Sequence, residues 1–453
     1  MRSRRALRNV SSFAAALAPV VSHRPSLSCE ATQLHDARHG MKAKFSDIEA
    51  RAQIIKRGFQ SKRDGSGPGG PLFKFGVVAD IQHADIEDAT NFSGSEKRQY
   101  RGALDTAREA VRYWEDKSLL FVAQLGDLID WQNAGKYGEG KKFADQPQSW
   151  NAVERVFDEL CGLDRSIPYL HTIGNHELYN FSIEELAILM GISGPIADSK
   201  VQSPSPFYYS FSPHPGWRII MLNAYEWSVS LPEGSEGRTQ AERILRANHP
   251  NAENILSSQG AVDYFEGLSG MGERFVPFNG AFGKDQLRWL NETLTTATKD
   301  NERVIILTHL PLHPLSCNGS GVRSRVSARN LAYDAPEVLN IIWENGSSCV
   351  AAILSGHAHN GGYFSEPSSA DHVNLTKPLP GEPCDSPPVR AGLHHVVLQG
   401  ALTHKHAYGH IAVYSDRLEL VGAAPLGMSF DDAKEAGFIP SRTLLLEPMR
   451  SKM

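Results

Sequence analysis

The chain has 453 residues, of which 41% are hydrophobic and 21% are charged, and its formal net charge is -5. A composition this close to the globular average excludes collagen-like, disordered and coiled-coil proteins. The length fits one large α/β domain or two ordinary domains. The small acidic excess gives no support to a nucleic-acid partner, and no apolar run approaches the roughly 18 residues needed for a membrane span.

The cysteines are few, odd in number and widely scattered, at Cys29, Cys161, Cys317, Cys349 and Cys384. No C-x-x-C pair occurs, so neither a disulfide framework nor a zinc ribbon is supported. We therefore expect a reducing, intracellular compartment. The scattered N-x-S/T sequons do not change this expectation, because such triplets arise easily by chance.

The two ends of the chain carry different targeting signals. Residues 1–29 contain several arginines and serines and no acidic residue, around a short apolar stretch at 13–21. Such a leader is typical of an organelle transit peptide, with a secretory signal or a disordered tail as alternatives. The final Ser451-Lys452-Met453 differs in one residue from the peroxisomal S-K-L address. We expect an organelle, mitochondrion or plastid, with the peroxisome and the cytosol as alternatives.

Composition divides the chain into three parts. Residues 1–70 end in a stretch rich in Gly and Pro and are expected to form a leader and a disordered linker. The folded domain is expected over residues 71–425, followed by a C-terminal tail at 426–453. Residues 226–283 interrupt the domain with a segment rich in Gly, Glu, Ser and Asn, which we expect to be an insertion that lines or covers the site.

Within the domain, short apolar runs alternate with helical patterns. Strands are predicted, in chain order, at 73–79, 119–125, 169–173, 218–222, 304–308, 350–354, 395–398, 409–414 and 418–421. Helices are predicted at 96–117, 150–161, 183–191, 284–298 and 336–345. This alternation predicts α/β layers, and the late strands without helices predict an antiparallel part in the second half.

Five short motifs place metal-ligating residue types at the ends of predicted strands, where α/β sheets put their sites. They are Asp80-Ile81-Gln82, Gly126-Asp127, Gly174-Asn175-His176-Glu177, His309, and Gly356-His357-Ala358-His359. Residues two apart on an extended segment share a face, so each such pair can reach one ion. Each motif alone is weak evidence, but the five in this order predict a metal centre.

With these motifs the chain resembles the calcineurin-like metallophosphoesterases, whose pattern is D-x-H, G-D, G-N-H-[D/E], H and G-H-x-H. Gln82 stands where this family usually has His. With this glutamine the chain resembles the subgroup of manganese-dependent ADP-ribose/CDP-alcohol diphosphatases. The stretches at 207–211, 279–283 and 286–290 also look like that subgroup. The resemblance covers roughly residues 72–423. It implies an α/β (α+β) fold, a four-layer sandwich of two mixed β-sheets flanked by helices, with metals at the strand C-terminal ends.

The resemblance also implies a site with two divalent metal ions. One ion would be held by Asp80, Gln82 and His359, the other by Asn175, His309 and His357, with Asp127 bridging both. Mixed oxygen and nitrogen ligands without thiolate favour Mn²⁺. His176 is implied as general acid, oriented by either Glu177 or Asp130, while a bridging hydroxide attacks phosphorus in line.

The implied reaction is hydrolysis of the phosphoanhydride in nucleoside diphosphate derivatives. ADP-ribose would give AMP and ribose 5-phosphate, and CDP-alcohols would give CMP and a phosphoalcohol. A cyclic-nucleotide phosphodiesterase or broad phosphatase on the same scaffold is the alternative, and a non-catalytic, metal-bound binding protein is a further one. We favour a monomer.

Contacts to the substrate are expected from aromatic and basic residues beyond the metal motifs. A base requires a stacking platform, for which the candidates are Tyr225, Trp227, Phe282 and Tyr408. Arg323 and Arg325 could neutralise the second phosphate. Core packing for the aromatic residues, and an ordinary solvated loop for the arginines, remain the alternatives.

Overall fold

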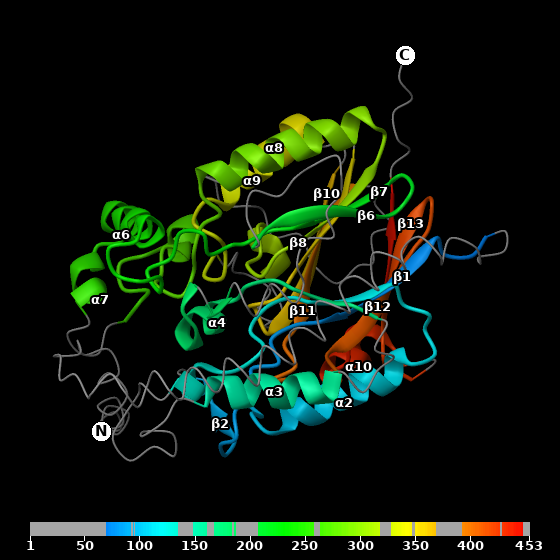
Figure 1. Cartoon of the computed structure of the whole chain (residues 1–453), viewed down its shortest axis with the longest axis horizontal. Coiled ribbons are helices and arrows are strands. Elements are labelled where there is room, and N and C mark those ends of the chain that lie inside the picture. Colours follow the sequence, from blue (N-terminus) through cyan, green and yellow to red (C-terminus); the bar gives the residue numbers. More distant parts are fainter. Residues whose placement is uncertain are drawn as a thin grey trace, which may run out of the picture.

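The computed structural model describes residues 69–91, 94, 96–134, 148–160, 167–183, 185–186, 207–257, 263–317, 328–346, 349–367, 392–425 and 428–446. Two six-stranded sheets lie face to face, and helices cover the outer face of each, which gives the four layers seen in Figure 1. The predicted α/β sandwich is therefore confirmed. Nearly all of the expected leader and linker lies outside the described residues.

The first sheet has the order β14-β13-β12-β1-β4-β5. Its strands are β1 (Phe73–Val78), β4 (Phe121–Gln124), β5 (Tyr169–His171), β12 (Tyr408–Val413), β13 (Arg417–Gly422) and β14 (Arg442–Leu445). β1, β4 and β5 run parallel. β12 pairs antiparallel with β1, and β13 and β14 continue the antiparallel part. The strands predicted at 409–414 and 418–421 thus form an antiparallel part, as the sequence predicts, whereas the strand predicted at 395–398 belongs to the other sheet and pairs parallel there.

The second sheet has the order β10-β11-β9-β8-β7-β6. Its strands are β6 (Tyr209–His214), β7 (Trp217–Met221), β8 (Arg303–Leu307), β9 (Val350–Ser355), β10 (Asn360–Pro367) and β11 (Gly392–Gln399). The four central strands are parallel. The edge strands β6 and β10 are antiparallel to their neighbours.

Alternation along the strands separates two apolar layers. Phe75 and Phe121 point between the sheets, where their rings stack with centroids 4.7 Å apart. Val78 and Val122 point the other way, toward α2 (Gly102–Trp114) and α3 (Ser149–Leu160). Because successive strand residues face opposite sides, each parallel strand must be apolar on both faces. This explains the continuous hydrophobic runs in the sequence.

The outer face of the second sheet is covered by α8 (Lys284–Lys299) and α9 (Ala335–Ile341), as Figure 1 shows. α9 continues into the π-helical turn η5 (Ile342–Gly346). Among the described residues, no helix combines the length and apolar character that crossing a membrane would require.

The predicted helix at 96–117 begins later than expected. Lys97–Arg98 forms strand β3, which pairs with β2 (Ala89–Thr90) in a small hairpin, and the helix starts only at Gly102. The backbone N–H of Gln99 donates to the carbonyl of Leu402 at 2.9 Å, so a tertiary contact overrides the helical pattern. The helix predicted at 183–191 lies largely outside the described residues.

Two segments for which the sequence predicts no helix contain helices. The insertion forms α6 (Glu236–Asn248), α7 (Ala252–Ser257) and the short η3 (Gly270–Arg274). The expected C-terminal tail contributes α10 (Phe430–Glu435) and the edge strand β14, which pairs with β13. The folded domain therefore extends past residue 425, because β14 completes the first sheet.

Candidate metal centre

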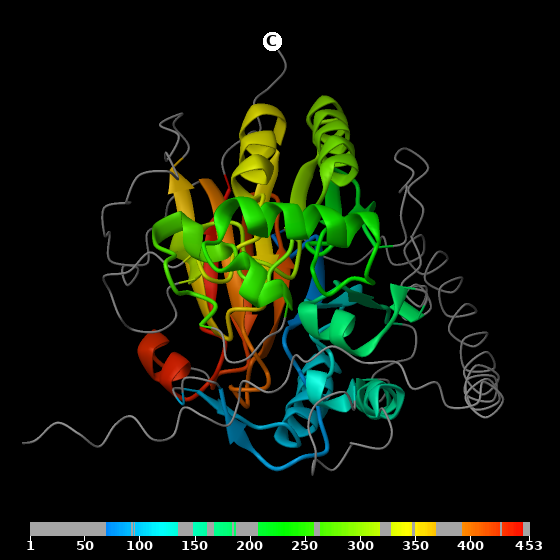
Figure 2. The ribbon, with the colours of Figure 1, turned by 90° about the vertical axis from the view of Figure 1, so that its left-hand side faces the viewer.

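The carboxyl ends of the parallel strands meet at one end of the sandwich, beside α4 (Asn175–Asn180) and the insertion, on the side that faces the viewer in Figure 2. In the first sheet, Val78 is in register with Gln124, and Gln124 with His171. Across the sandwich, the N–H of Ala401 donates to the carbonyl of Ala79 at 3.0 Å. Segments far apart in the sequence are thereby fixed around one site.

Asp127 lies at the middle of the gathered motifs and is almost fully buried. Its Oδ2 is 3.4 Å from Nε2 of His309 and 3.0 Å from Nε2 of Gln82. Ligand atoms of Asp127, His309 and His357 all lie within 4.8 Å of one another. Burial alone would raise the pKa of Asp127, but the charges of His309 and His176 hold it below its usual range. A carboxylate kept ionised among nitrogen ligands suits a cation.

The remaining expected ligands adjoin this cluster. Nε2 of His359 lies 3.6 Å from Oδ1 of Asp80 and 3.0 Å from Nε2 of Gln82. Asn175, the first residue of α4, accepts a hydrogen bond on Oδ1 from the Tyr225 hydroxyl at 3.3 Å. The structure thus brings all seven residues to one place: Asp80, Gln82, Asp127, Asn175, His309, His357 and His359.

The arrangement of the cluster is better explained by bound cations than by a hydrogen-bond network in which every polar atom has a partner. Oε1 of Gln82 is buried and has no partner among the described residues, although its Nε2 faces both Asp127 and His359. A half-turn of the amide would direct this oxygen ligand into the cluster. Asp80, Gln82, Asp127 and His357 all have positive φ values, of 52°, 43°, 57° and 67°. Such backbone costs about 1–3 kcal/mol per residue and is typical of ligand clamps.

Two motif glycines are required by close packing at this site. A Cβ atom at Gly174 would overlap the Asp127 carboxylate, and one at Gly126 would overlap the His309 ring. Gly126 also has a φ of 94°, which glycine adopts most readily. The glycines of the G-D and G-N-H motifs therefore let the backbone approach the ligands.

His176 is held beside the ligands and presents one nitrogen to them. Its Nδ1 accepts the N–H of Trp131 at 2.9 Å, so in the neutral ring Nε2 carries the proton, 3.9 Å from Oδ2 of Asp127. Burial lowers the pKa of His176 and so favours this neutral form, although the negative charges of Asp127 and Asp130 act to raise the pKa. Oδ2 of Asp130 lies 3.5 Å from Nδ1. Of the two candidates for orienting His176, the structure places Asp130 in contact.

Glu177 has a different task, because it fastens two motif loops together. Its carboxylate accepts the backbone N–H groups of Asp127 at 2.9 Å, Leu128 at 2.6 Å and Gly174 at 2.7 Å. Burial raises the pKa of Glu177 to about 7, while the hydrogen bonds to the backbone favour the ionised form. The carboxylate thus sets the spacing between the two motifs rather than the orientation of His176.

We expect Glu177→Gln to lower the free energy of unfolding by about 1.5–3 kcal/mol. In the variant an amide NH₂ would face a backbone N–H group that the carboxylate accepts in the unaltered chain, so that N–H would lose its acceptor. Urea unfolding of the cation-free protein measures this change. Glu115→Gln, at an exposed position on the protein surface, is the matched control. Equal unfolding midpoints for the two variants would contradict the fastening role of Glu177.

Three of the expected stacking residues do not offer open ring faces, and the fourth, the half-buried Trp227, packs against the small apolar cluster of the insertion. Tyr225 and Phe282 are each 1% exposed, and Tyr408 is 6% exposed. The Tyr225 hydroxyl instead holds the ligand Asn175. Tyr408 packs against Tyr113 on the α2 side. The proposed stacking roles are therefore corrected to packing and support, while Arg323 and Arg325 lie outside the described residues.

Other aromatic side chains do reach the edge of the metal centre. The half-buried Phe278 ring lies 6.0 Å from that of His357, and Tyr264 and Phe265 meet it edge-on at 6.2 and 6.1 Å. All three belong to the insertion. The sequence analysis did not single out these three residues. The only signal for them was their position in a segment that is expected to line or cover the site.

Arg98 is a second residue that sequence reasoning missed. It belongs to β3, and burial would lower its pKa, but the charge of Asp130 raises it. Nε of Arg98 is buried without a hydrogen-bond partner among the described residues. This half-buried guanidinium lies close enough to Asp130 and His176 for its charge to act to lower the pKa of both.

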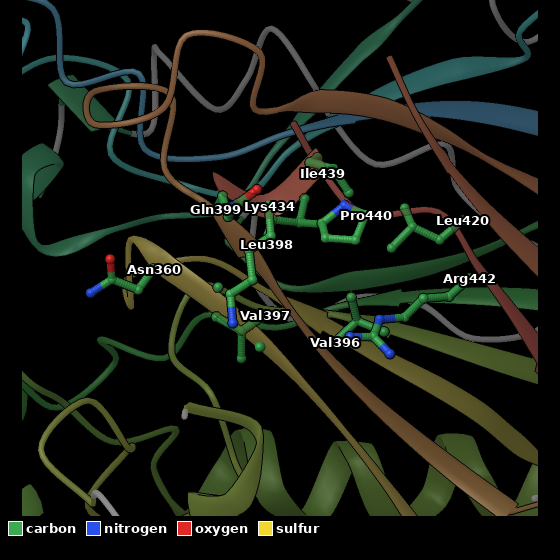
Figure 3. A pocket seen from close by; sticks show the side chains of 12 residues that line it. Asn360, Val396, Val397, Leu398, Gln399, Leu420, Lys434, Ile439, Pro440 and Arg442 are labelled. Atoms are coloured by element: carbon green, nitrogen blue, oxygen red, sulfur yellow. The ribbon is translucent and has the colours of Figure 1, made fainter. Parts of the chain in front are cut away.

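A crevice shown in Figure 3 begins beside the last motif, where Asn360 and Gly361 follow His359. Its walls are largely apolar, with Lys434 and Arg442 among the lining residues. It contains none of the seven ligands and neither His176 nor Asp130. The chemistry is therefore assigned to the motif cluster and not to this crevice.

Comparisons with known proteins agree with this geometry. Residues 73–361 match the calcineurin-like phosphoesterase family. A human protein named manganese-dependent ADP-ribose/CDP-alcohol diphosphatase is 35% identical over 360 residues, which cover 78% of this chain and 90% of that protein. The protein of the same name from Arabidopsis thaliana is 33% identical, over 79% of this chain and 96% of its own length. The crystal structure of a dimetal phosphatase from Danio rerio superposes with a TM-score of 0.62, at 29% identity, and covers 83% of this chain and 100% of that one.

Proposed function

This chain belongs to the calcineurin-like phosphoesterase family, and we propose that it is a manganese-dependent hydrolase of nucleoside diphosphate derivatives. ADP-ribose would be cleaved to AMP and ribose 5-phosphate, and CDP-alcohols to CMP and a phosphoalcohol. The observation that carries the proposal is the convergence of the motif residues on Asp127. The diphosphatase activity named for the relatives supports the choice of substrate.

The residues present fit two divalent cations. Asp80, Gln82 and His359 would hold one, and Asn175, His309 and His357 the other, with Asp127 between them. Such ions, when bound, supply positive charge to the phosphoryl oxygens and lower the pKa of water. Oxygen and nitrogen ligands without sulfur are compatible with Mn²⁺.

The protein side chains supply the remaining tasks. His176 would act as general acid in its protonated form, which the Asp130 carboxylate would stabilise; donation of the Nε2 proton to the leaving oxygen would then leave a neutral ring. Arg98 would contact the phosphate that does not react. Phe278 would stack on the base at the edge of the centre.

We expect Phe278→Ala to raise KM for ADP-ribose by about 5- to 150-fold, because stacking on a base is worth about 1–3 kcal/mol. The value of kcat should change little, since the ring does not contact the scissile bond. Steady-state kinetics with ADP-ribose and with bis-(p-nitrophenyl) phosphate, which has no base, provide the matched comparison. Equal losses with both substrates would contradict the stacking role.

The proposal is tested by hydrolysis assays of the purified chain with ADP-ribose, CDP-choline, a 2′,3′-cyclic nucleotide and a simple phosphomonoester. Each substrate is assayed with Mn²⁺, Mg²⁺ or Zn²⁺. We expect the highest kcat/KM for the two diphosphates with Mn²⁺. A preference for the cyclic nucleotide or the monoester would favour a sibling phosphohydrolase, and bound metal without turnover of any substrate would favour a binding protein.

A further inference from the structure

One acidic side chain outside the five motifs contacts a histidine of the metal centre. Oε2 of Glu96 lies 3.3 Å from Nδ1 of His359, and the Glu96 side chain is 15% exposed. The other ring nitrogen of His359 faces the centre, 3.0 Å from Nε2 of Gln82 and 3.6 Å from Oδ1 of Asp80. His359 is thus held from both sides.

Glu96 is fixed in this position by the small hairpin of β2 and β3. The N–H of Asn91 donates to the Glu96 carbonyl at 2.9 Å, and the N–H of Glu96 donates to Oδ1 of Asn91 at 3.2 Å. The hairpin is tied to the loop after β11 by the bond from Gln99 to Leu402. That same loop is tied to the first motif, because the N–H of Leu402 donates to the Asp80 carbonyl at 2.9 Å.

The contact determines which nitrogen of His359 can bind a cation. An ionised carboxylate can only accept hydrogen bonds, so Nδ1 carries the proton and donates it to Glu96. Nε2 then has a free lone pair, toward which the Gln82 amide points in this structure. A carboxylate that holds a metal-binding histidine in this way fixes the tautomer and raises the basicity of the ligating nitrogen.

The two other histidines of the centre have neutral acceptors instead. Nδ1 of His309 lies 2.6 Å from a backbone carbonyl. Nε2 of His357 lies 3.2 Å from Oδ1 of Asn279, whose NH₂ group donates to two backbone carbonyls and so leaves the oxygen toward His357. Among these three described histidines, only His359 therefore has a charged partner outside the seven expected ligands, and Glu96 adds negative charge to one side of the centre.

We propose that Glu96 is a positioning residue for the cation held by Asp80, Gln82 and His359. Glu96 holds the His359 ring with Nε2 toward this cation and strengthens its binding. The neighbouring cation, between Asn175, His309 and His357, depends on it much less. The inference rests on the paired cations of the proposed function.

The variants Glu96→Ala and Glu96→Gln test this role, with Asp88→Asn as control. Asp88 lies directly before β2 of the same hairpin but forms an exposed ion pair with Lys97 at 3.1 Å. Each protein is stripped of metal with a chelator and titrated with Mn²⁺, and the free ion is measured by electron paramagnetic resonance. Circular dichroism melting of the stripped proteins measures the stability of each fold.

We expect the unaltered chain and Asp88→Asn to bind two Mn²⁺ ions alike. Glu96→Ala should weaken one binding step by about 10- to 100-fold and leave the other nearly unchanged. Glu96→Gln should fall between them, because its amide oxygen can still accept from Nδ1 but carries no charge.

Unchanged affinities for both ions in both Glu96 variants would overturn the inference, and so would equal weakening of both steps together with a lower melting temperature. If the unaltered chain binds no Mn²⁺ at all, the proposed function fails and this inference with it. If it binds two ions and the Glu96 variants do so equally well, the inference about Glu96 fails alone.

Discussion

Asp127→Asn is expected to remove cation binding and hydrolysis together, lowering kcat/KM by at least about 10⁴-fold, or roughly 5.4 kcal/mol of transition-state stabilisation. Oδ2 of Asp127 lies close to Gln82 and His309, which belong to the two different ligand sets. An amide has no negative charge and offers only one oxygen, so it cannot serve both sets. Loss of either cation would remove the positive charge that the phosphoryl group requires.

The measurement is metal content by elemental analysis after dialysis against Mn²⁺, together with kcat/KM for ADP-ribose. Asp116→Asn is the matched control, since Asp116 is exposed and pairs with Lys117 on the surface. The melting temperature of each variant without metal establishes that it is folded. Retention of two ions by Asp127→Asn would contradict a bridging role for this carboxylate.

His176→Ala is expected to keep both cations and lower kcat by about 10²- to 10⁴-fold. Its Nε2 points toward Asp127 from a distance of 3.9 Å, with Nδ1 engaged by the Trp131 N–H, so the ring offers a proton rather than a ligand lone pair. The loss should be greater for leaving groups that need protonation. A p-nitrophenolate leaving group, which departs as a stable anion, should suffer less.

Rates for ADP-ribose and for a p-nitrophenyl diester, measured alongside Mn²⁺ content, separate these effects. His214→Ala is the control, because His214 lies at the end of β6 and bonds its own neighbour, Pro215. Loss of Mn²⁺ from the His176→Ala protein would contradict the role of proton donor. An equal fall in kcat for both leaving groups would contradict it as well.

The parallel core could be predicted because its signal is local. Every predicted strand overlaps a strand of the structure, since strands buried on both faces appear as continuous apolar runs. The start of α2 could not be predicted in this way. Residues 96–101 continue the helical pattern, and only the contact between Gln99 and Leu402, some three hundred positions later, draws them into a hairpin.

The metal ligands could be anticipated for a related reason. Each follows directly after a strand, and parallel strands end at the same edge of a sheet, so position in the sequence decides position in space. The sequence does not choose between Asp130 and Glu177 as the orienting partner of His176. Glu177 is the next residue along the chain, whereas Asp130 follows a different motif and reaches the ring through the packing of η2 (Trp131–Ala134) against α4.

Substrate contacts were the least predictable part of the site. An aromatic residue in a loop has the same local sequence signal whether its ring is buried or open. Tyr225 and Phe282 are buried in the main apolar cluster, whereas Phe278, only a few residues away from Phe282, reaches the edge of the centre. Long-range packing of the insertion decides between these outcomes, and no period or spacing in the sequence encodes it.

Anomalous X-ray diffraction from crystals grown with Mn²⁺ tests most directly whether two cations share Asp127. We expect two anomalous peaks, one beside Asp80, Gln82 and His359 and one beside Asn175, His309 and His357, with Asp127 in contact with both. A single peak, peaks elsewhere in the fold, or no peak at this edge of the sheets would contradict it.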